Sequence, residues 1–380
     1  MVSSGEEPIG RRVARWRVRR RMTQQMLADR LGRSKSWVDK VERGVRSLDR
    51  YPVIQEVAEV LRVDSLALLG EGRPSPTSAG PPDGVDDIRA ALARYDIRRQ
   101  SASAAETTRH VGHAWLTYQH AQYAQVVRLL PGLLDAARGL RADAPGLLVQ
   151  AYRITSSVLV KLGEADLGWL AADRAVAAAG GDRVLAASAA VSVGQALRAL
   201  GRDRLALAVT TAATRRLAPA SVHGALLIQG ALAAAGCGDA GRSAELVERA
   251  AALAAGHGGR DDPHRTSFGP VAVELARVVA AVELGEAGAA VARHERAVGG
   301  EAWRGLPAEY RAAYLLDVAR AYLMVGDLHG AGRTVVEADG VAPAEVRCRP
   351  VARTVLAEVA RAHPAPAGVA RLTRVIGLTR

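Results

Sequence analysis

The sequence predicts an all-α protein in which a compact basic head precedes a long stack of helical hairpins. Alanine, leucine, valine and arginine dominate the 380 residues, of which 49% are hydrophobic and only 4% aromatic. Because Ala, Leu and Arg have high helix propensities, this mixture favours helices over sheets. A set of small residues also recurs at fixed offsets through the second half of the chain. The length suggests two or three domains.

Positive charge is concentrated near the N-terminus. Residues 9–50 contain 14 Lys and Arg but only 4 Asp and Glu, so they carry ten of the twelve net positive charges of the chain. Apolar residues are interleaved with the basic ones, as in a folded segment. A block of this density is typical of a surface that binds phosphate. The alternative is a solvated face or a basic tail.

Residues 23–44 have the pattern of two helices joined by a tight turn. Thr23 and Ser34 are suitable N-caps, and Gly32 suits a left-handed residue between the helices. Apolar residues would bury the inner face of the second helix. A helix of this kind fits the major groove and can present three or four side chains to base edges. The outer face would carry Lys35, Ser36, Asp39 and Lys40, with Arg43 at its end.

This stretch resembles the helix-turn-helix of the lambda-repressor and Cro-like family, often called XRE. The flanking segments resemble the first helix and the last two helices of that family, so the match covers about residues 9–70. It implies a five-helix domain that binds double-stranded DNA, as a dimer on an inverted-repeat operator. Arg33 and Trp37 depart from the pattern, because small residues are usual there. The resemblance rests on Gln24, Leu27, Ala28, Gly32, Ser34, Val38, Val41, Glu42 and Gly44.

The resemblance also implies which residues contact DNA. Lys35, Ser36 and Lys40 would face base edges, Gln24 would hold the DNA backbone, and arginines after the second helix would contact phosphates. Two of the three lysines of the chain lie here. The alternative for both lysines is a solvated helix face, and for Trp37 packing against a neighbouring helix or against a sugar is equally open. The expected contacts are Gln24, Arg33, Ser34, Lys35, Ser36, Trp37, Lys40, Arg43 and Arg46.

A segment rich in proline, glycine and serine separates the head from the rest. Residues 71–84 read EGRPSPTSAGPPDG, and no apolar period crosses them. The helical part should open with a short amphipathic helix from Asp86 to about Arg99. We therefore expect a DNA-binding domain at 1–73, a linker at 74–85 and a helical repeat domain at 86–380.

Five glycines mark a repeat in the second part, with spacings of 38, 37, 47 and 41 residues: Gly163, Gly201, Gly238, Gly285 and Gly326. The residue five positions after each anchor is small, the residue twelve positions after is alanine, and four of the five residues seven positions before are small. This predicts one helical hairpin per unit, in which the glycine ends the first helix. A less regular hairpin is expected at about Thr107–Arg138, and a capping helix pair from Pro343.

The repeat resembles the tetratricopeptide repeat over about residues 140–340 and implies an α-solenoid. Its combination with the head resembles peptide-pheromone receptors of Gram-positive bacteria and actinobacterial regulators of development and specialised metabolism. That resemblance implies a transcriptional regulator whose repeats bind a peptide or small-molecule effector and form a homodimer. The alternative is a protein-interaction scaffold that recruits a partner protein to DNA.

The first helix of a tetratricopeptide-like hairpin lines the concave groove, at positions i, i+3, i+7 and i+10. These positions are mostly polar, with arginines, in the first two units and apolar in the next two, and the fifth unit carries one charge, Arg320. A ligand with an acidic group and an apolar body would suit such a groove. The alternative is that the C-terminal helix of the protein fills the apolar middle. The expected effector contacts are Gln150, Arg153, Ser157, Gln195, Arg198, Ile228, Leu232 and Arg320.

Other function classes find little support. Cys237 and Cys348 are too few for a disulfide framework, so a cytoplasmic, nucleoid-associated protein is expected. No secretory signal and no apolar run of about 18 residues is found, so no membrane association is expected. The histidines lack further ligands at metal spacing, and His257–His264 has the composition of a surface loop, so no metal is expected. Without a phosphate-loop or nucleophile motif, we expect neither a cofactor nor an enzyme.

Overall fold

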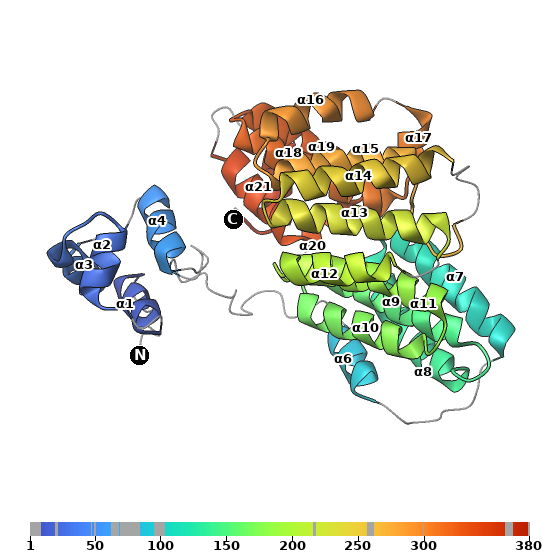
Figure 1. Cartoon of the computed structure of the whole chain (residues 1–380). Coiled ribbons are helices and arrows are strands. Elements are labelled where there is room, and N and C mark those ends of the chain that lie inside the picture. The colour runs from blue at the N-terminus through green and yellow to red at the C-terminus, as the bar shows by residue number, and fades with distance from the viewer. Residues whose placement is uncertain are drawn as a thin grey trace. The chain divides into compact units, whose positions relative to one another are not determined.

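The computed structural model describes residues 9–19, 22–46, 48, 51–61, 68, 84–94, 103–215, 218–256, 262–298, 300–361 and 368–378. Within these ranges the regular structure is helical and no strand occurs, which confirms the predicted all-α class. The chain divides into two compact units, Met1–Gly80 and Pro81–Arg380 (Figure 1).

The first unit contains α1 (Ile9–Arg19), α2 (Gln24–Arg30), α3 (Lys35–Glu42) and α4 (Tyr51–Leu61). Most of the predicted fifth helix lies outside the described residues. Leu68 is buried, and its carbonyl oxygen accepts a hydrogen bond from Nη1 of Arg12 at 3.1 Å. One apolar core joins these helices: Val13, Met22, Leu27, Ala28, Leu31, Val38, Val41, Leu48, Ile54, Val57, Ala58, Leu61 and Leu68.

Local signals fix the helix-turn-helix as the sequence predicts. Oγ1 of Thr23 accepts a hydrogen bond from the Met26 N–H at 3.1 Å, and Oγ of Ser34 accepts one from the Trp37 N–H at 3.1 Å. Gly32 has φ of 59°, in the left-handed region. The orientation of α3 relative to α2 therefore follows from short-range contacts.

A close helix crossing holds α1 against α3. A Cβ atom on Gly10 would lie 2.0 Å from the carbonyl oxygen of Val41. Because that oxygen belongs to the α3 backbone, no side-chain movement can relieve the contact. Glycine at this position therefore sets how close the two helices come.

The second unit begins slightly earlier than predicted. α6 (Val85–Ala93) starts at Val85, which is fully buried in the core of this unit, whereas the sequence placed residue 85 in the linker. Residues 69–83, and the predicted extension of this helix through residues 95–99, lie outside the described residues.

The remaining helices form antiparallel hairpins and a C-terminal group (Figure 1). They are α7 (Ala104–Gln119), α8 (Tyr123–Gly139), α9 (Pro145–Lys161), α10 (Ala165–Ala178), α11 (Arg183–Ala199), α12 (Asp203–Ala213), α13 (Ala220–Gly236), α14 (Ala240–Ala255), α15 (Pro270–Glu283), α16 (Ala287–Ala297), α17 (Glu301–Arg304), α18 (Ala308–Met324), α19 (Leu328–Val341), α20 (Pro343–Cys348), α21 (Pro350–Val359) and α22 (Val369–Val375). The early hairpin is α7 and α8, as predicted, and three described helices rather than a pair follow Pro343.

Each predicted anchor glycine turns the chain between two helices. The φ angles of Gly163, Gly201, Gly238, Gly285 and Gly326 are 84°, 65°, 78°, 81° and 81°. In the first turn, the Glu164 N–H donates to the Leu159 carbonyl at 2.9 Å, a Schellman bond. Equivalent bonds close the other four turns: Arg202 to Leu197, Asp239 to Ala234, Glu286 to Ala281 and Asp327 to Tyr322.

The small residues of the repeat lie where helices approach closely. A Cβ on Gly168 would lie 2.9 Å from Cγ2 of Val160, and one on Gly194 would lie 2.7 Å from Cγ2 of Thr210. Four of the five alanines at the later offset are buried, and the fifth, Ala297, is half-buried. The repeat pattern thus encodes the packing within and between hairpins.

The two ends of the hairpin stack meet. The first helices of successive hairpins, α9, α11, α13, α15 and α18, pack in that order, and α18 also packs against α7. One core cluster accordingly contains residues from Val85 to Ile376. The stack is solenoid-like in its repeats but closes on itself, which buries much of the inner face of its first helices.

Candidate DNA-binding surface and effector groove

The outer face of α3 carries the side chains that the sequence assigned to base edges. Lys35, Ser36 and Lys40 are exposed, whereas Val38 and Val41 on the opposite face are buried. An α-helix with side chains is about 10–12 Å wide, and the major groove of B-DNA is about 12 Å wide. The face is therefore free and shaped to enter a major groove.

Basic side chains continue beyond the end of α3. Arg43 is exposed, and its Nη1 lies 3.2 Å from Oδ2 of Asp39. Arg46 is also exposed, and its backbone N–H donates to the Lys40 carbonyl at 3.0 Å. A pair as exposed as Arg43–Asp39 contributes little and leaves the arginine available to phosphate.

Gln24 has a partner inside the head. Its Nε2 donates to Oε2 of Glu42 at 2.9 Å, and Glu42 also accepts hydrogen bonds from Nε and Nη2 of Arg17 at 2.6 and 3.0 Å. Nη1 of Arg17 donates to the Met22 carbonyl at 2.8 Å. This network ties α1, α2 and α3 together. A contact of Gln24 with the DNA backbone stays a prediction. The sequence had not distinguished Arg17 from the other arginines of the basic block.

The two departures from the family pattern contact each other. The Arg33 guanidinium lies 5.8 Å from the ring centroid of Trp37, and its Nη2 lies 3.7 Å from Oε2 of Glu56. Trp37 is half-buried against the core of the head. Trp37 thus packs against the core, and Arg33 is directed toward α4; contacts of these two residues with DNA stay predictions.

The expectation that Arg153 faces an open groove is wrong. Its side chain is 2% exposed, and Nη1 donates to the His264 carbonyl at 2.7 Å and to Oε1 of Gln150 at 3.3 Å. The guanidinium lies 5.5 Å from the Trp115 ring centroid. Burial lowers the pKa of Arg153 to about 10, against the opposing effect of Asp262. Residues 262–264 of the predicted surface loop are half-buried or exposed, and the His264 carbonyl is the point at which the loop contacts this arginine.

The apolar middle of the predicted groove is likewise closed. Ile228 and Leu232 are 6% and 7% exposed, in a cluster with Phe268 and residues of α15. Tyr310 of α18 packs against the same cluster. The coverage comes from neighbouring first helices and from a connecting loop, and not from the C-terminal helix that had been the alternative. Apolar faces that meet in a closed stack bury one another.

Two further predicted contacts, Arg198 and Arg320, are half-buried and have polar partners. Nη1 of Arg320 lies 2.9 Å from Oε1 of Glu283 and 3.4 Å from Oδ1 of Asp317. Nη1 of Arg198 donates to Oε1 of Gln229 at 3.2 Å. Burial lowers the pKa of Arg198, although Glu283, Asp317 and Asp203 act to raise it. Gln195 is exposed and Ser157 is half-buried. Effector binding by these residues stays a prediction.

A buried ionic cluster joins the two ends of the stack, and the sequence had not suggested it. Nζ of Lys161 lies 2.9 Å from Oε2 of Glu309 and 2.8 Å from Oε1 of Glu345. Glu345 is fully buried, and it also accepts a hydrogen bond from the Tyr123 hydroxyl. The available signal was Lys161 itself, because it is the third lysine in a chain that otherwise uses arginine.

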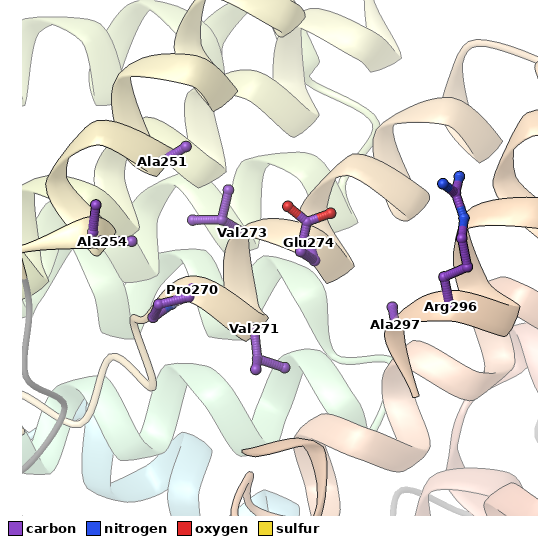
Figure 2. A pocket seen from close by; sticks show the side chains of 9 residues that line it. Ala251, Ala254, Pro270, Val271, Val273, Glu274, Arg296 and Ala297 are labelled. Carbon is purple, nitrogen blue, oxygen red and sulfur yellow. The ribbon is translucent and has the colours of Figure 1, made fainter. Parts of the chain in front are cut away.

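A pocket of about 350 Å³ lies between the end of α14, the start of α15 and the end of α16 (Figure 2). None of the effector contacts predicted from the sequence lines it. The signal in the sequence is the 47-residue spacing between Gly238 and Gly285, which places the longest connector here. Apart from Glu274 and Arg296 the lining is apolar: Ala251, Ala254, Ala255, Pro270, Val271, Val273 and Ala297.

Comparison with known proteins bears on the first unit. A family model described as a helix-turn-helix domain matches residues 8–69. No curated protein and no solved structure matches the chain. The matched residues span α1 to α4 and reach Leu68. The head is therefore a helix-turn-helix domain, which indicates a DNA-binding regulator.

In the ranges that the structure describes, no helix combines the length and the apolar character that a membrane span requires. In the same ranges, no three His, Cys, Asp or Glu side chains gather as a metal site would require.

Proposed function

We propose that this protein is an XRE-type transcriptional regulator that reads a specific DNA sequence with the outer face of α3. The observation that carries the proposal is the exposure of Lys35, Ser36 and Lys40 on a capped helix whose inner face is buried. The Glu42 network holds that helix against α1 and α2. Side chains on such a preorganised face can contact base edges without further ordering of the backbone.

The test compares specific and non-specific DNA binding by the full chain. Duplexes enriched from a random pool supply the operator, and fluorescence anisotropy at fixed salt measures affinity. Lys35→Ala and Lys40→Ala should weaken operator binding by about 1–3 kcal/mol, or roughly 5- to 150-fold, with less effect on random DNA. Arg46→Ala should weaken both about equally, because phosphates carry no sequence information.

A matched control distinguishes the loss of a residue of the α3 face from the loss of any positive charge. Arg183→Ala removes one exposed positive charge from α11 in the second unit, and it should leave both affinities unchanged. Equal losses on operator and random DNA for the two lysine variants would assign those lysines to phosphates. Binding that is unaffected by both lysine variants would contradict the proposal.

We also propose that the protein binds an inverted repeat as a homodimer formed by the second unit. The head is strongly basic and would repel a second head, whereas the second unit exposes large apolar side chains on outer helices. Trp169 on α10 is 43% exposed and Leu205 on α12 is 57% exposed. Light scattering at tens of micromolar should give a dimer, and Trp169→Ser with Leu205→Ser should shift it toward monomer. A wild-type monomer would contradict this proposal.

The tetratricopeptide-like unit is proposed to bind a peptide or small-molecule effector that changes operator affinity. Support comes from the polar end of the inner face, where Arg198 and Arg320 lie near Glu283 and Asp317. Arg198→Ala should leave basal DNA binding intact and abolish the change caused by an effector. The second candidate, a scaffold that recruits a partner protein, is favoured if a stable protein co-purifies and DNA affinity responds to no ligand.

A further inference from the structure

The connector between α14 and α15 packs across the inner face of the hairpin stack. Its described part begins at Asp262 and reaches Phe268, two residues before α15. The His264 carbonyl contacts Arg153 of α9, and Phe268 lies against Gly224 of α13. Seven residues therefore bridge first helices of separate hairpins, in the region where the sequence predicted an effector.

At α9, the Arg153 side chain is held in place to donate a hydrogen bond to an oxygen atom of the connector. Nη1 of Arg153 donates to the His264 carbonyl at 2.7 Å, while Gln150 accepts hydrogen bonds from both Arg153 and Nε1 of Trp115, the latter at 3.0 Å. The Trp115 ring supports the guanidinium at 5.5 Å. These side chains fix the direction in which the arginine donates.

The α13 end is a niche for an aromatic ring. A Cβ on Gly224 would lie 2.1–2.6 Å from three ring atoms of Phe268, so the ring sits directly on the helix backbone. Phe268 is 6% exposed and belongs to the cluster that contains Leu227 and Ile228. Any larger residue at position 224 would close the niche.

The bridging segment, residues 262–268, has internal hydrogen bonds and two residues in left-handed conformations. Oδ1 of Asp262 accepts a hydrogen bond from the Thr266 N–H at 2.9 Å, and Oδ2 accepts one from the Ser267 N–H at 2.7 Å. Arg265 and Ser267 have φ of 51° and 52°, left-handed conformations that are unfavourable for residues other than glycine. The segment is thus held by a few specific contacts against local backbone strain.

The fit at Arg153 is incomplete. Among the described residues, Nε of Arg153 and Nδ1 of His264 are buried without a hydrogen-bond partner. A single carbonyl uses one N–H of the guanidinium, whereas a carboxylate can accept two in parallel. A competing ligand that offers a carboxylate could therefore satisfy more of this arginine than the resident carbonyl does.

We propose that Trp115, Gln150, Arg153 and Gly224 form a peptide-binding site whose resident occupant is the segment Asp262–Phe268. A peptide that places a carboxylate on Arg153 and an aromatic ring on Gly224 displaces this segment. The proposal rests on the proposed function only for the identity of the competitor, which would be the effector. The site itself is independent of DNA binding.

Tethering sets how strongly the resident segment competes. A segment joined to its site by a short connector acts at an effective concentration of about 1 mM. If the free segment binds an open site with a Kd of about 10 µM, the tethered segment reduces the apparent affinity for a competitor by about 100-fold. Releasing the segment should therefore raise the apparent affinity for a competitor by about the same 100-fold factor.

The experiment uses the full chain and a synthetic heptapeptide with the sequence of residues 262–268, blocked at both ends and labelled for anisotropy. The released variant carries Asp262→Ala and Phe268→Ala, and circular dichroism checks its helix content. We expect it to bind the heptapeptide at least tenfold more tightly than the wild type does. Adding Arg153→Met or Gly224→Ala should remove that binding. Gly112→Ala is the matched control, because nothing lies within 4 Å of its added Cβ.

A second measurement does not depend on the released variant. Arg153→Met alone should accelerate trypsin cleavage after Arg265, followed by mass spectrometry, because the segment loses its contact with α9. The proposal is overturned if that rate is unchanged, if the folded released variant fails to bind the heptapeptide, or if the wild type binds it equally well. Operator binding by the same variants reports separately on the proposed function, since none of these changes touches the head.

Discussion

Replacing Lys161 by methionine should destabilise the second unit strongly. The change keeps the length and the apolar part of the side chain but removes the ammonium group that lies between Glu309 and Glu345. Both carboxylates are buried, at 8% and 0% exposed. They belong to α18 and α20, whereas Lys161 ends α9, so the cluster joins the first anchor-glycine hairpin to the last.

The magnitude follows from the geometry. At N–O distances of 2.9 and 2.8 Å, each attraction is about 5–6 kcal/mol for an effective dielectric constant near 20. Desolvation of the three charges offsets most of this in the wild type. Removing Lys161 leaves Glu309 without its cation and Glu345 with Arg349 alone, whose Nη1 lies 3.5 Å from Oε2. Breaking such a buried pair costs about 3–5 kcal/mol, or a fall in Tm of roughly 6–20 °C.

Scanning calorimetry and urea unfolding of the full chain test this value. A triple variant with Lys161→Met, Glu309→Gln and Glu345→Gln should recover much of the loss, because neither carboxylate charge is then left buried. Lys40→Met is the matched control, since that lysine is exposed and its replacement should change stability by no more than about 0.5 kcal/mol. A loss below about 1 kcal/mol for Lys161→Met, or a triple variant no more stable than the single one, would refute the reasoning.

The pH dependence provides a second check. The two carboxyl groups shift in opposite directions. Burial raises the pKa of Glu345, but Lys161 and Arg349 outweigh this effect and the net shift is downward, whereas burial keeps the pKa of Glu309 above its usual value. The acid loss of stability therefore comes from Glu345. Its stabilisation is therefore present above the unfolded pKa of about 4.3 and is lost as pH falls through the folded value. Without Lys161, burial should raise the pKa of Glu309 further and the pKa of Glu345 less, because Glu345 keeps Arg349, and stability should then increase as pH falls. The difference between wild type and Lys161→Met should shrink from pH 8 to pH 5, and a constant difference would contradict the assignment.

Three further changes test the fold. Gly10→Ala should destabilise the head by about 1–3 kcal/mol, because the new Cβ meets the Val41 carbonyl at 2.0 Å; hydrogen exchange in α1 to α3 would report it, and unchanged exchange would contradict the crossing. Gly238→Ala should cost about 1 kcal/mol through its φ of 78° alone, since nothing lies within 4 Å; a neutral or raised Tm would argue against the turn. Ser34→Ala should lower the free energy of unfolding of the head by about 1 kcal/mol, measured in urea, because α3 loses its N-cap. Ser36→Ala is the control, since Ser36 lies within α3 and is not its N-cap.

Much of the fold was predictable because its signals are local. A helix N-cap, a left-handed glycine and a small residue at a crossing each act within a few residues of themselves. This is why Thr23, Ser34 and the five anchor glycines occupy the places expected of them. The outer face of α3 was predictable for the same reason, since burial of Val38 and Val41 fixes which side chains remain outside.

The helices expected to line the effector groove are present, but three of the predicted contacts, Arg153, Ile228 and Leu232, are buried. The periodicity of α9 assigns Arg153 to the inner face, but it cannot show what else occupies that face. The answer depends on His264, 111 residues further along the chain. In the head, Gln24 similarly bonds to Glu42 across 18 residues, a contact that helix periodicity does not report.

The sequence by itself determined the helices, their turns, the hairpin repeat and the exposed basic face of α3, because spacing along the chain encodes contacts within a helix and between consecutive helices. Only the tertiary structure decided that the hairpin stack closes, that Lys161 joins carboxylates from its far end, and that the connector after α14 contacts Arg153 and Gly224. Those outcomes depend on contacts between residues more than a hundred positions apart, such as Arg153 with His264 and Tyr123 with Glu345. Which distant surfaces meet is set by the accumulated geometry of every hairpin between them, and no local pattern records that sum.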